Sequence, residues 1–503
     1  MLCGQLILKL AYPHKLNTMK FEKMLISREL HMFIGRRNEL NMLEESYKSD
    51  KSELVVIYGR RRIGKSRLVK EFGKDKSHFF SFEALENSSM AEQMNHFVKQ
   101  MSGQINDPFI NNINFDSWHD IFSYLTTKLI KNSRRQKKLV VFFDEIQWMA
   151  GKRSTLISLI KYFWDKEWKD QNIMLIMCGS IASFMIDKVI NSKALYGRMT
   201  MEMHLKGLQL NEIPAFFSSD TSNEEIIKYI SVFGTVPKYF EMIDKNRSFE
   251  QNINKLCFSG NAVMITEMEK IFYSQFQEAA NYIQIVNLLK KGMLNLKEIS
   301  EKTGMPSGGG LKRYIENLEK ADIVKSFVPW NKKSDSKIKK YSIIDEFLNF
   351  YFRYIEPNKV DITGTNRGNL FKSYTSDSFA VWLGLAFEKM CVKHSIFLAD
   401  IMGFKNEVAS SGSHFSIDND RFQVDLIYKR FDKVVTICEI KHHTKELSAE
   451  IIKEMERKKQ LLKIPRGYSV ETALISTYGP DKSLKSSGYF NHFVTAQDIF
   501  SKR

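Results

Sequence analysis

The chain has 503 residues, of which 43% are hydrophobic and 12% aromatic, so three or four domains with real cores are expected. No apolar run reaches the roughly 18 residues that a membrane-spanning helix needs, which excludes an integral membrane protein and membrane partners. The net charge of +17 favours a polyanionic partner, with nucleic acid first, although a lysine-rich surface that only keeps a protein in solution gives the same excess.

The five cysteines are scattered and none has metal-ligand spacing, which predicts a reducing, cytoplasmic location. They are Cys3, Cys178, Cys257, Cys391 and Cys438. Residues 1–32 form a predicted N-terminal extension. Its short apolar stretch is interrupted by Lys9, so it is a poor signal peptide.

A phosphate-loop pattern follows a short apolar strand at 54–58 and precedes a helix expected from Lys65 to Phe72. In such a loop the backbone N–H groups and the helix dipole form an anion site. We expect Lys65 to reach the β- and γ-phosphates of ATP and Ser66 to bind Mg²⁺. The residues of the predicted loop are Gly59, Arg60, Arg61, Arg62, Ile63, Gly64, Lys65 and Ser66.

A second strand, at 139–143, ends in two acids. A continuous apolar run is typical of a buried parallel strand, and ligands bind beyond the carboxyl ends of such strands. Asp144 is therefore the candidate that holds Mg²⁺, and Glu145 is the candidate general base that orients the attacking water.

A third strand, at 173–178, leads to Gly179 and Ser180. Ser180 is a candidate sensor of the γ-phosphate, and an ordinary turn after a strand explains the same residues. Further on, Arg198 follows Gly197, and an arginine in such a place can stabilise a transferred phosphoryl group in its own subunit or in a neighbouring one.

These motifs occur in one order and together resemble the archaeal-type ATPase family, in the STAND branch of the AAA+ proteins. The resemblance covers about residues 33–275 and implies an α/β core at 33–205 with a helical lid at 206–275. It also implies a catalytic or sensor role for Arg198, and a homo-oligomer if that arginine acts in the neighbouring subunit. The family usually has a second glycine where this chain has Thr235, although Pro237 can still start a lid helix.

Three helical signals and two strands in residues 276–345 predict a winged helix-turn-helix. Asn295 with Glu298 gives a capping-box start, and Lys312 and Arg313 lie on the expected third helix. The hairpin tip contributes Lys332, Lys333 and Lys337. These cations suit a DNA backbone, whereas the apolar pattern suits a protein-interaction or autoinhibitory module equally well.

Residues 346–503 begin with an aromatic helix stripe and later show an acidic pattern on two strands. Glu439 and Lys441 are two apart and project from one face of a strand. Asp425 on the adjacent strand can meet them, and such a group can bind a divalent cation and activate water. An ordinary hairpin with a surface salt bridge is the alternative.

This pattern resembles the PD-(D/E)XK nuclease superfamily and the C-terminal domain of unknown function that follows the archaeal-type ATPase. The resemblance implies a restriction-endonuclease-like α/β domain, with Glu388 as the acid from its first helix. Metal ligands would then be Glu388, Asp425 and Glu439, with Lys441 catalytic. Val424 stands where the superfamily pattern has proline.

The sequence thus predicts a Mg²⁺-dependent ATPase whose nucleotide state controls a winged helix and a nuclease-like domain acting on DNA. One alternative is an ATP-gated signalling or toxin-associated switch with vestigial C-terminal acids. Another is a DNA-binding regulator that does not cleave.

Overall fold

The computed structural model describes residues 33–131, 137–151, 155–180, 184–276, 278–328, 339–364, 368–416 and 422–501. The predicted N-terminal extension and the hairpin-tip lysines Lys332, Lys333 and Lys337 lie outside these residues.

The first half of the chain is built on a five-stranded parallel sheet in the order β2-β3-β4-β1-β5. The three apolar runs expected as strands are β1, β3 and β4, and nearly every residue of each is fully buried. Their bounds are β1 Glu53–Tyr58, β2 Phe79–Glu83, β3 Leu139–Asp144, β4 Ile173–Gly179 and β5 Met201–His204.

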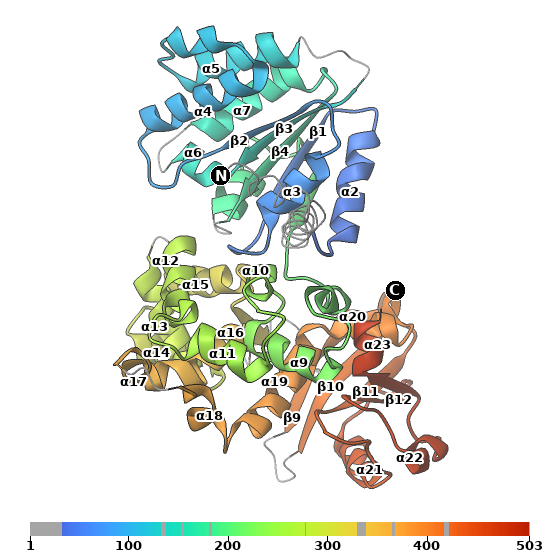
Figure 1. Ribbon diagram of the computed structural model, residues 1–503. Coiled ribbons are helices and arrows are strands. Elements are labelled where there is room, and N and C mark those ends of the chain that lie inside the picture. Colours follow the sequence, from blue (N-terminus) through green and yellow to red (C-terminus); the bar gives the residue numbers. More distant parts are fainter. Residues whose placement is uncertain are drawn as a thin grey trace, which may run out of the picture.

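Helices cover both faces of this sheet (Figure 1). Alternate residues of β1 point to opposite sides, so Val55 packs with α2 and α3 while Val56 packs with α4, α5 and α7. The helical segments of this half are α2 Arg37–Lys48, α3 Lys65–Gly73, α4 Met90–Ile105, η1 Pro108–Asn112, α5 Trp118–Leu125, η2 Thr126–Ile130, α6 Ile146–Ala150, α7 Leu156–Phe163, η3 Trp164–Trp168 and η4 Met185–Ile190.

A helical region follows, and Pro237 does start a helix, α10, as its missing N–H and fixed φ allow. Thr235 is buried, and its backbone carbonyl accepts a hydrogen bond from the N–H of Leu208. The segments are η5 Leu210–Phe216, α9 Asn223–Phe233, α10 Pro237–Phe240, α11 Phe249–Cys257, η6 Val263–Thr266 and α12 Glu267–Gln275.

Three helices and a small antiparallel sheet come next, and we call residues 279–343 the helix–hairpin module. Asn295 accepts a hydrogen bond from the N–H of Glu298, whose carboxylate accepts one from the N–H of Asn295, so the predicted capping box is present. The elements are α13 Ala279–Leu289, β6 Leu294–Asn295, α14 Leu296–Thr303, α15 Gly309–Lys320, β7 Val324–Phe327 and β8 Lys340–Ile343.

The C-terminal third carries a second, mixed sheet in the order β13-β12-β11-β10-β9, with β9, β10 and β11 antiparallel and β11, β12 and β13 parallel (Figure 1). Its strands are β9 Val408–Ser416, β10 Phe422–Arg430, β11 Val434–Lys441, β12 Ser469–Ser476 and β13 His492–Thr495. The helical segments are α16 Glu346–Phe350, η7 Tyr351–Ile355, η8 Glu356–Asn358, α17 Lys359–Gly364, α18 Leu370–Thr375, α19 Phe379–Lys393, α20 Ser395–Ile401, η9 Lys405–Glu407, α21 Ile451–Leu461, α22 Lys482–Ser486 and α23 Ala496–Phe500.

The aromatic stripe on α16 and η7 is core, as its spacing predicts. Phe347, Phe350 and Tyr354 are buried in one hydrophobic cluster that runs from Leu208 to Phe500. Because this cluster joins the helical region, the helix–hairpin module and one face of the mixed sheet, no separate cores mark the predicted boundaries near residues 275 and 345. The division into domains stays a prediction.

Within the described residues, no helix is long and apolar enough to cross a membrane. The four cysteines among those residues are buried thiols without a disulfide.

Gly59 follows β1 at a point where the backbone of Leu205 comes so close that there is no room for a side chain. Its φ is +158°, and a Cβ there would lie 2.2 Å from the carbonyl oxygen of Leu205, which continues β5. We expect Gly59→Ala to lower the free energy of unfolding by about 1–3 kcal/mol, because backbone cannot yield as a side chain can. Gly103→Ala, in open space on α4, should raise it by about 0.5–1 kcal/mol. Thermal or urea unfolding of both variants checks this, and equal stability of the two would contradict it.

Candidate nucleotide site and acid cluster

The loop after β1 has the strand–loop–helix geometry that its sequence predicts. Gly64 precedes α3 with φ +92°, so the first N–H groups of the helix face the loop. The buried ammonium of Lys65 lies inside the loop and donates to the carbonyl oxygens of Gly59 and Arg60, each at 3.0 Å. Ile63 is buried under the loop. This is an anion-binding cradle.

Asp144 ends β3 next to this loop and is almost fully buried. Burial raises its pKa to about 6, although the Ser66 hydroxyl hydrogen bond acts in the opposite direction. The negative charge of a buried carboxylate is costly unless a positive charge lies beside it. A carboxylate and a hydroxyl are oxygen ligands of the kind that a hard divalent cation prefers. Ser66 and Asp144 therefore fit Mg²⁺.

Glu145 is held in a left-handed conformation, φ 52°, which is uncommon for a residue other than glycine and clusters at functional sites. The Ser180 hydroxyl and N–H donate to its Oε2 at 2.7 and 3.2 Å. The amide of Gln147 also donates to that oxygen and to the Ser180 hydroxyl. The structure thus brings Glu145 and Ser180 together and adds Gln147, which the sequence analysis missed although it follows the two acids closely.

Arg198 lies elsewhere. It precedes β5, whose first residue, Met201, pairs with Val55 near the start of β1. Its guanidinium binds Asp165 through two bonds of 2.6 and 2.8 Å. Since the strands are parallel, Arg198 sits at the amino edge of the sheet, opposite the edge where the loop begins. The structure does not bring it to the loop of its own chain.

Each of the three loop arginines forms an ion pair with a carboxylate outside the loop. Arg60 pairs with Asp345, and both side chains are buried. Arg62, at φ 72°, pairs with the fully buried Glu267 at 2.5 Å. Arg61 is exposed and pairs with Glu86 at 3.0 Å. Because their side chains are engaged in these ion pairs, only their backbone N–H groups can take the predicted role in nucleotide binding.

Asp345 and its neighbour connect the loop to the C-terminal third. Asp345 also accepts the N–H of Leu348 at 2.7 Å and so caps α16. The next residue, Glu346, binds Lys393 of α19 through both oxygens, at 2.9 and 2.7 Å. No local sequence signal indicated these pairs, because the partners are far apart along the chain.

Asp425, Glu439 and Lys441 do converge, and we call them, with Glu388, the acid cluster. Asp425 accepts the N–H of Ile440 at 3.0 Å, between the two β11 residues. Lys441 lies 2.7 Å from one oxygen of Glu439. Lys458 of α21, which the sequence analysis missed, lies 2.6 Å from the other oxygen.

Glu388 lies on α19 facing the same cluster. Burial raises its pKa to about 7, and the charge of Asp425 adds to the effect. Among the described residues, however, no group of three or more His, Cys, Asp or Glu side chains is arranged to hold a metal ion. Because two ammonium groups occupy Glu439, the acid cluster in this arrangement does not fit a divalent cation, and its metal role stays a prediction.

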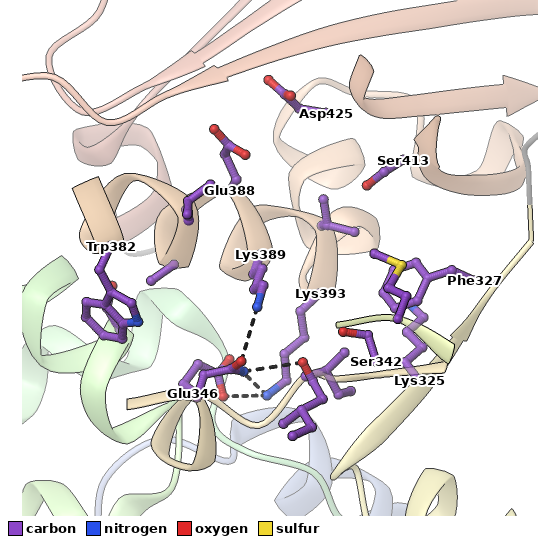
Figure 2. Close-up of a pocket in the computed structure, with 18 of the residues that line it drawn as sticks. Lys325, Phe327, Ser342, Glu346, Trp382, Glu388, Lys389, Lys393, Ser413 and Asp425 are labelled. Carbon is purple, nitrogen blue, oxygen red and sulfur yellow. Dashed lines mark hydrogen bonds and ion pairs between the residues drawn. The ribbon is translucent and has the colours of Figure 1, made fainter. Parts of the chain in front are cut away.

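A cavity of about 510 Å³ opens beside the acid cluster. It is bounded by the helix–hairpin module, by α16 and η7, by α19, and by β9 and β10. Figure 2 shows Glu388 and Asp425 at one end and Lys389, Lys393 and Glu346 towards the other. Glu346, which lines the cavity, is the residue after Asp345, and Asp345 is the ion-pair partner of Arg60 in the loop.

Residues 33–243 match the family model described as an ATPase domain predominantly from Archaea. An uncharacterized protein of Methanocaldococcus jannaschii is 28% identical over 71% of this chain and 76% of its own length. An uncharacterized ATP-binding protein of the same organism is 44% identical over 45 residues, which cover 9% of this chain and 76% of that protein.

Among solved structures, a Walker-type ATPase of Pyrococcus abyssi aligns with a TM-score of 0.46 and 18% identity, covering 64% of this chain and 96% of that one. The matched family segment contains the loop, the acids Asp144 and Glu145 at the end of β3, and β4 with Ser180 directly after it. Residues 33–243 of the chain therefore form an archaeal-type ATPase domain that contains a phosphate loop.

Proposed function

We propose that this ATPase uses Mg²⁺-ATP to control the C-terminal third of the chain. The observation that carries the proposal is the buried ion pair between Arg60 in the phosphate loop and Asp345 at the start of α16. A buried charge without its counter-charge is costly, so Arg60 and Asp345 must stay together. A loop that moves when nucleotide binds would therefore move Asp345 or strain the pair. The proposed units are the core at 33–205, the lid at 206–275, a winged helix at 276–345 and a nuclease-like domain at 346–503.

Each residue at the loop has a proposed task. Lys65 neutralises the β- and γ-phosphates, and the loop N–H groups hold the rest of the triphosphate. Ser66 and Asp144 hold Mg²⁺, which supplies charge to the phosphate oxygens. Glu145 orients and deprotonates water, and Ser180 reports the γ-phosphate to it through their hydrogen bond.

Arg198 is proposed to act in a neighbouring subunit. Its place at the amino edge of the sheet, paired with Asp165, supports action outside its own loop. A homo-oligomer would present this edge to the next nucleotide, where the guanidinium would stabilise the transferred phosphoryl group.

A second proposed function is action on DNA. Lys312 and Arg313 are exposed on α15, where a recognition helix would contact a duplex backbone. The convergence of Glu388, Asp425 and Lys441 supports a nuclease-like domain, and the ion pair of Lys458 with Glu439 supports the alternative, an ATP-gated switch whose domain does not cleave.

We expect Lys65→Ala to reduce ATP hydrolysis by about 100-fold or more, because it removes the charge that faces the transferred phosphate. Release of phosphate from ATP with Mg²⁺ measures this. Lys74→Ala, an exposed lysine just beyond the end of α3, is the matched control and should hydrolyse at the parental rate. Parental hydrolysis by Lys65→Ala would refute the site.

Asp345→Asn should separate ATP binding from its effect on the C-terminal third. Asparagine still caps α16 but leaves Arg60 without its counter-charge. Hydrogen exchange with and without a non-hydrolysable ATP analogue should show a nucleotide-dependent change at 346–355 in the parent and none in the variant. Glu86→Gln, which breaks the exposed pair of the same loop, should keep the change. Persistence of the change in Asp345→Asn would rule out this route.

If the acid cluster cleaves DNA, the purified chain should nick plasmid DNA with Mg²⁺ or Mn²⁺, and Asp425→Ala should abolish nicking. Glu446→Ala, an exposed acid after β11, is the control. DNA binding without nicking in the parent would identify a regulator. No affinity for DNA, together with ATP-dependent oligomerisation, would identify the switch.

A further inference from the structure

The cavity beside the acid cluster has a charge distribution that the proposed ATPase chemistry does not use. Five cations line it, namely Lys290, Lys325, Arg353, Lys389 and Lys393. Lys290 and Lys393 are ion-paired to Glu356 and Glu346, but Lys325, Arg353 and Lys389 have no ion pair with a carboxylate of the described residues. These five cations outnumber the three carboxylates that line the cavity, Glu346, Glu388 and Asp425, and the excess of positive charge favours an anion.

The side chains of Lys325, Arg353 and Lys389 are exposed to solvent, so a ligand in the cavity can reach them. Lys389 makes one hydrogen bond, of 3.1 Å, to the side-chain oxygen of Asn349. Each of the three cations can therefore contact an anionic ligand without first breaking an ion pair within the described residues.

Aromatic side chains supply flat apolar walls. Phe327, Phe352, Trp382 and Phe415 line the cavity. Trp382 is fixed by stacking on Phe379 at 5.4 Å between ring centroids, while Phe415 is 46% exposed. Alternating cations and aromatic faces are what single-stranded nucleic acid requires, because phosphates pair with the cations and bases stack on the rings.

The volume of the cavity and the charges at its two ends limit which form of nucleic acid it can hold. About 510 Å³ is the size of a small-ligand pocket and cannot enclose a duplex. Glu388 and Asp425 lie at one end of the cavity, on the far side of Lys389 and Lys393 from Glu346 (Figure 2), so a strand bound by the lysines would meet the acids at that end.

We propose that this cavity binds a short unpaired segment of nucleic acid, with phosphates on Lys325, Arg353 and Lys389 and a base against Phe415. The inference deepens the proposed action on DNA and rests on it. It names single-stranded ends or flaps as the substrate class, and it places their terminus at the acid cluster. Binding needs no metal ion, because the cations of the protein itself neutralise the phosphates.

The test is fluorescence anisotropy of the full chain with a labelled oligo-deoxythymidine of about ten nucleotides, in EDTA so that nothing is cleaved. A blunt duplex of equal length is the competitor and should compete weakly. Lys389→Ala and Phe415→Ala should each weaken binding about fivefold or more. Lys405→Ala, on η9 outside the cavity, should bind like the parent.

The salt dependence separates a phosphate contact from a general structural effect. Loss of one contact in Lys389→Ala should make the slope of log affinity against log salt shallower by about 0.7, whereas Phe415→Ala should leave the slope unchanged. Parental affinity in both variants, or a duplex that competes as well as the single strand, would overturn the proposal.

The result also distinguishes the two proposals. Binding of the oligonucleotide that depends on Lys389, with no nicking by the parent, would uphold the cavity and refute the nuclease. Metal-dependent nicking that needs Asp425, with no affinity for the oligonucleotide, would uphold the nuclease and refute the cavity.

Discussion

The buried pair of Arg60 with Asp345 is the contact on which the relation between the two halves of the molecule depends. Two charges taken out of water are costly, and removal of either partner leaves the other uncompensated. Burial lowers the pKa of Arg60, and the field of Asp345 outweighs this and raises it, so the guanidinium stays charged. Its Nε and Nη2 are buried without another partner in the structure, which leaves Asp345 as its principal counter-charge. The loop cannot shift far without moving α16.

From Asp345 the connection continues through adjacent polar contacts to the acid cluster. Glu346 forms an ion pair with Lys393 at the end of α19. Glu388 lies on the same helix, more than one turn earlier. A helix transmits displacement along its axis because its backbone bonds hold it rigid. The phosphate loop and the cavity wall are therefore joined by two ion pairs, one helix cap and one helix, which is a contiguous route for the proposed action of nucleotide.

Patterns local in sequence predicted local structure well. The glycine spacing of the loop, the capping box at Asn295 and the apolar strand that ends at Asp144 each act within a few residues, so the sequence contains the whole signal. Contacts between distant segments were not predictable in this way. Arg60 and Asp345 are 285 residues apart, and nothing near either distinguishes a buried partner from a surface one. The convergence of Asp425, Glu439 and Lys441 was predicted from strand parity and from the adjacency of the two strands, whereas Glu388 was named only through the family resemblance. Lys458 was missed because it comes from a helix whose docking the sequence does not specify. The division into domains stays a prediction, because one hydrophobic cluster runs through the predicted boundaries near residues 275 and 345.

Lys458 has a consequence for how the acid cluster can work. The Glu439 carboxylate bridges two ammonium groups and cannot at the same time serve as an open metal ligand. Freeing it would leave Lys458, only 5% exposed, without its main partner, so α21 would have to move as well. Recognition of a nucleic-acid strand in the neighbouring cavity carries no such requirement, because the cations and rings there are already in place. In the proposed scheme, binding of a strand can therefore precede any metal-dependent step.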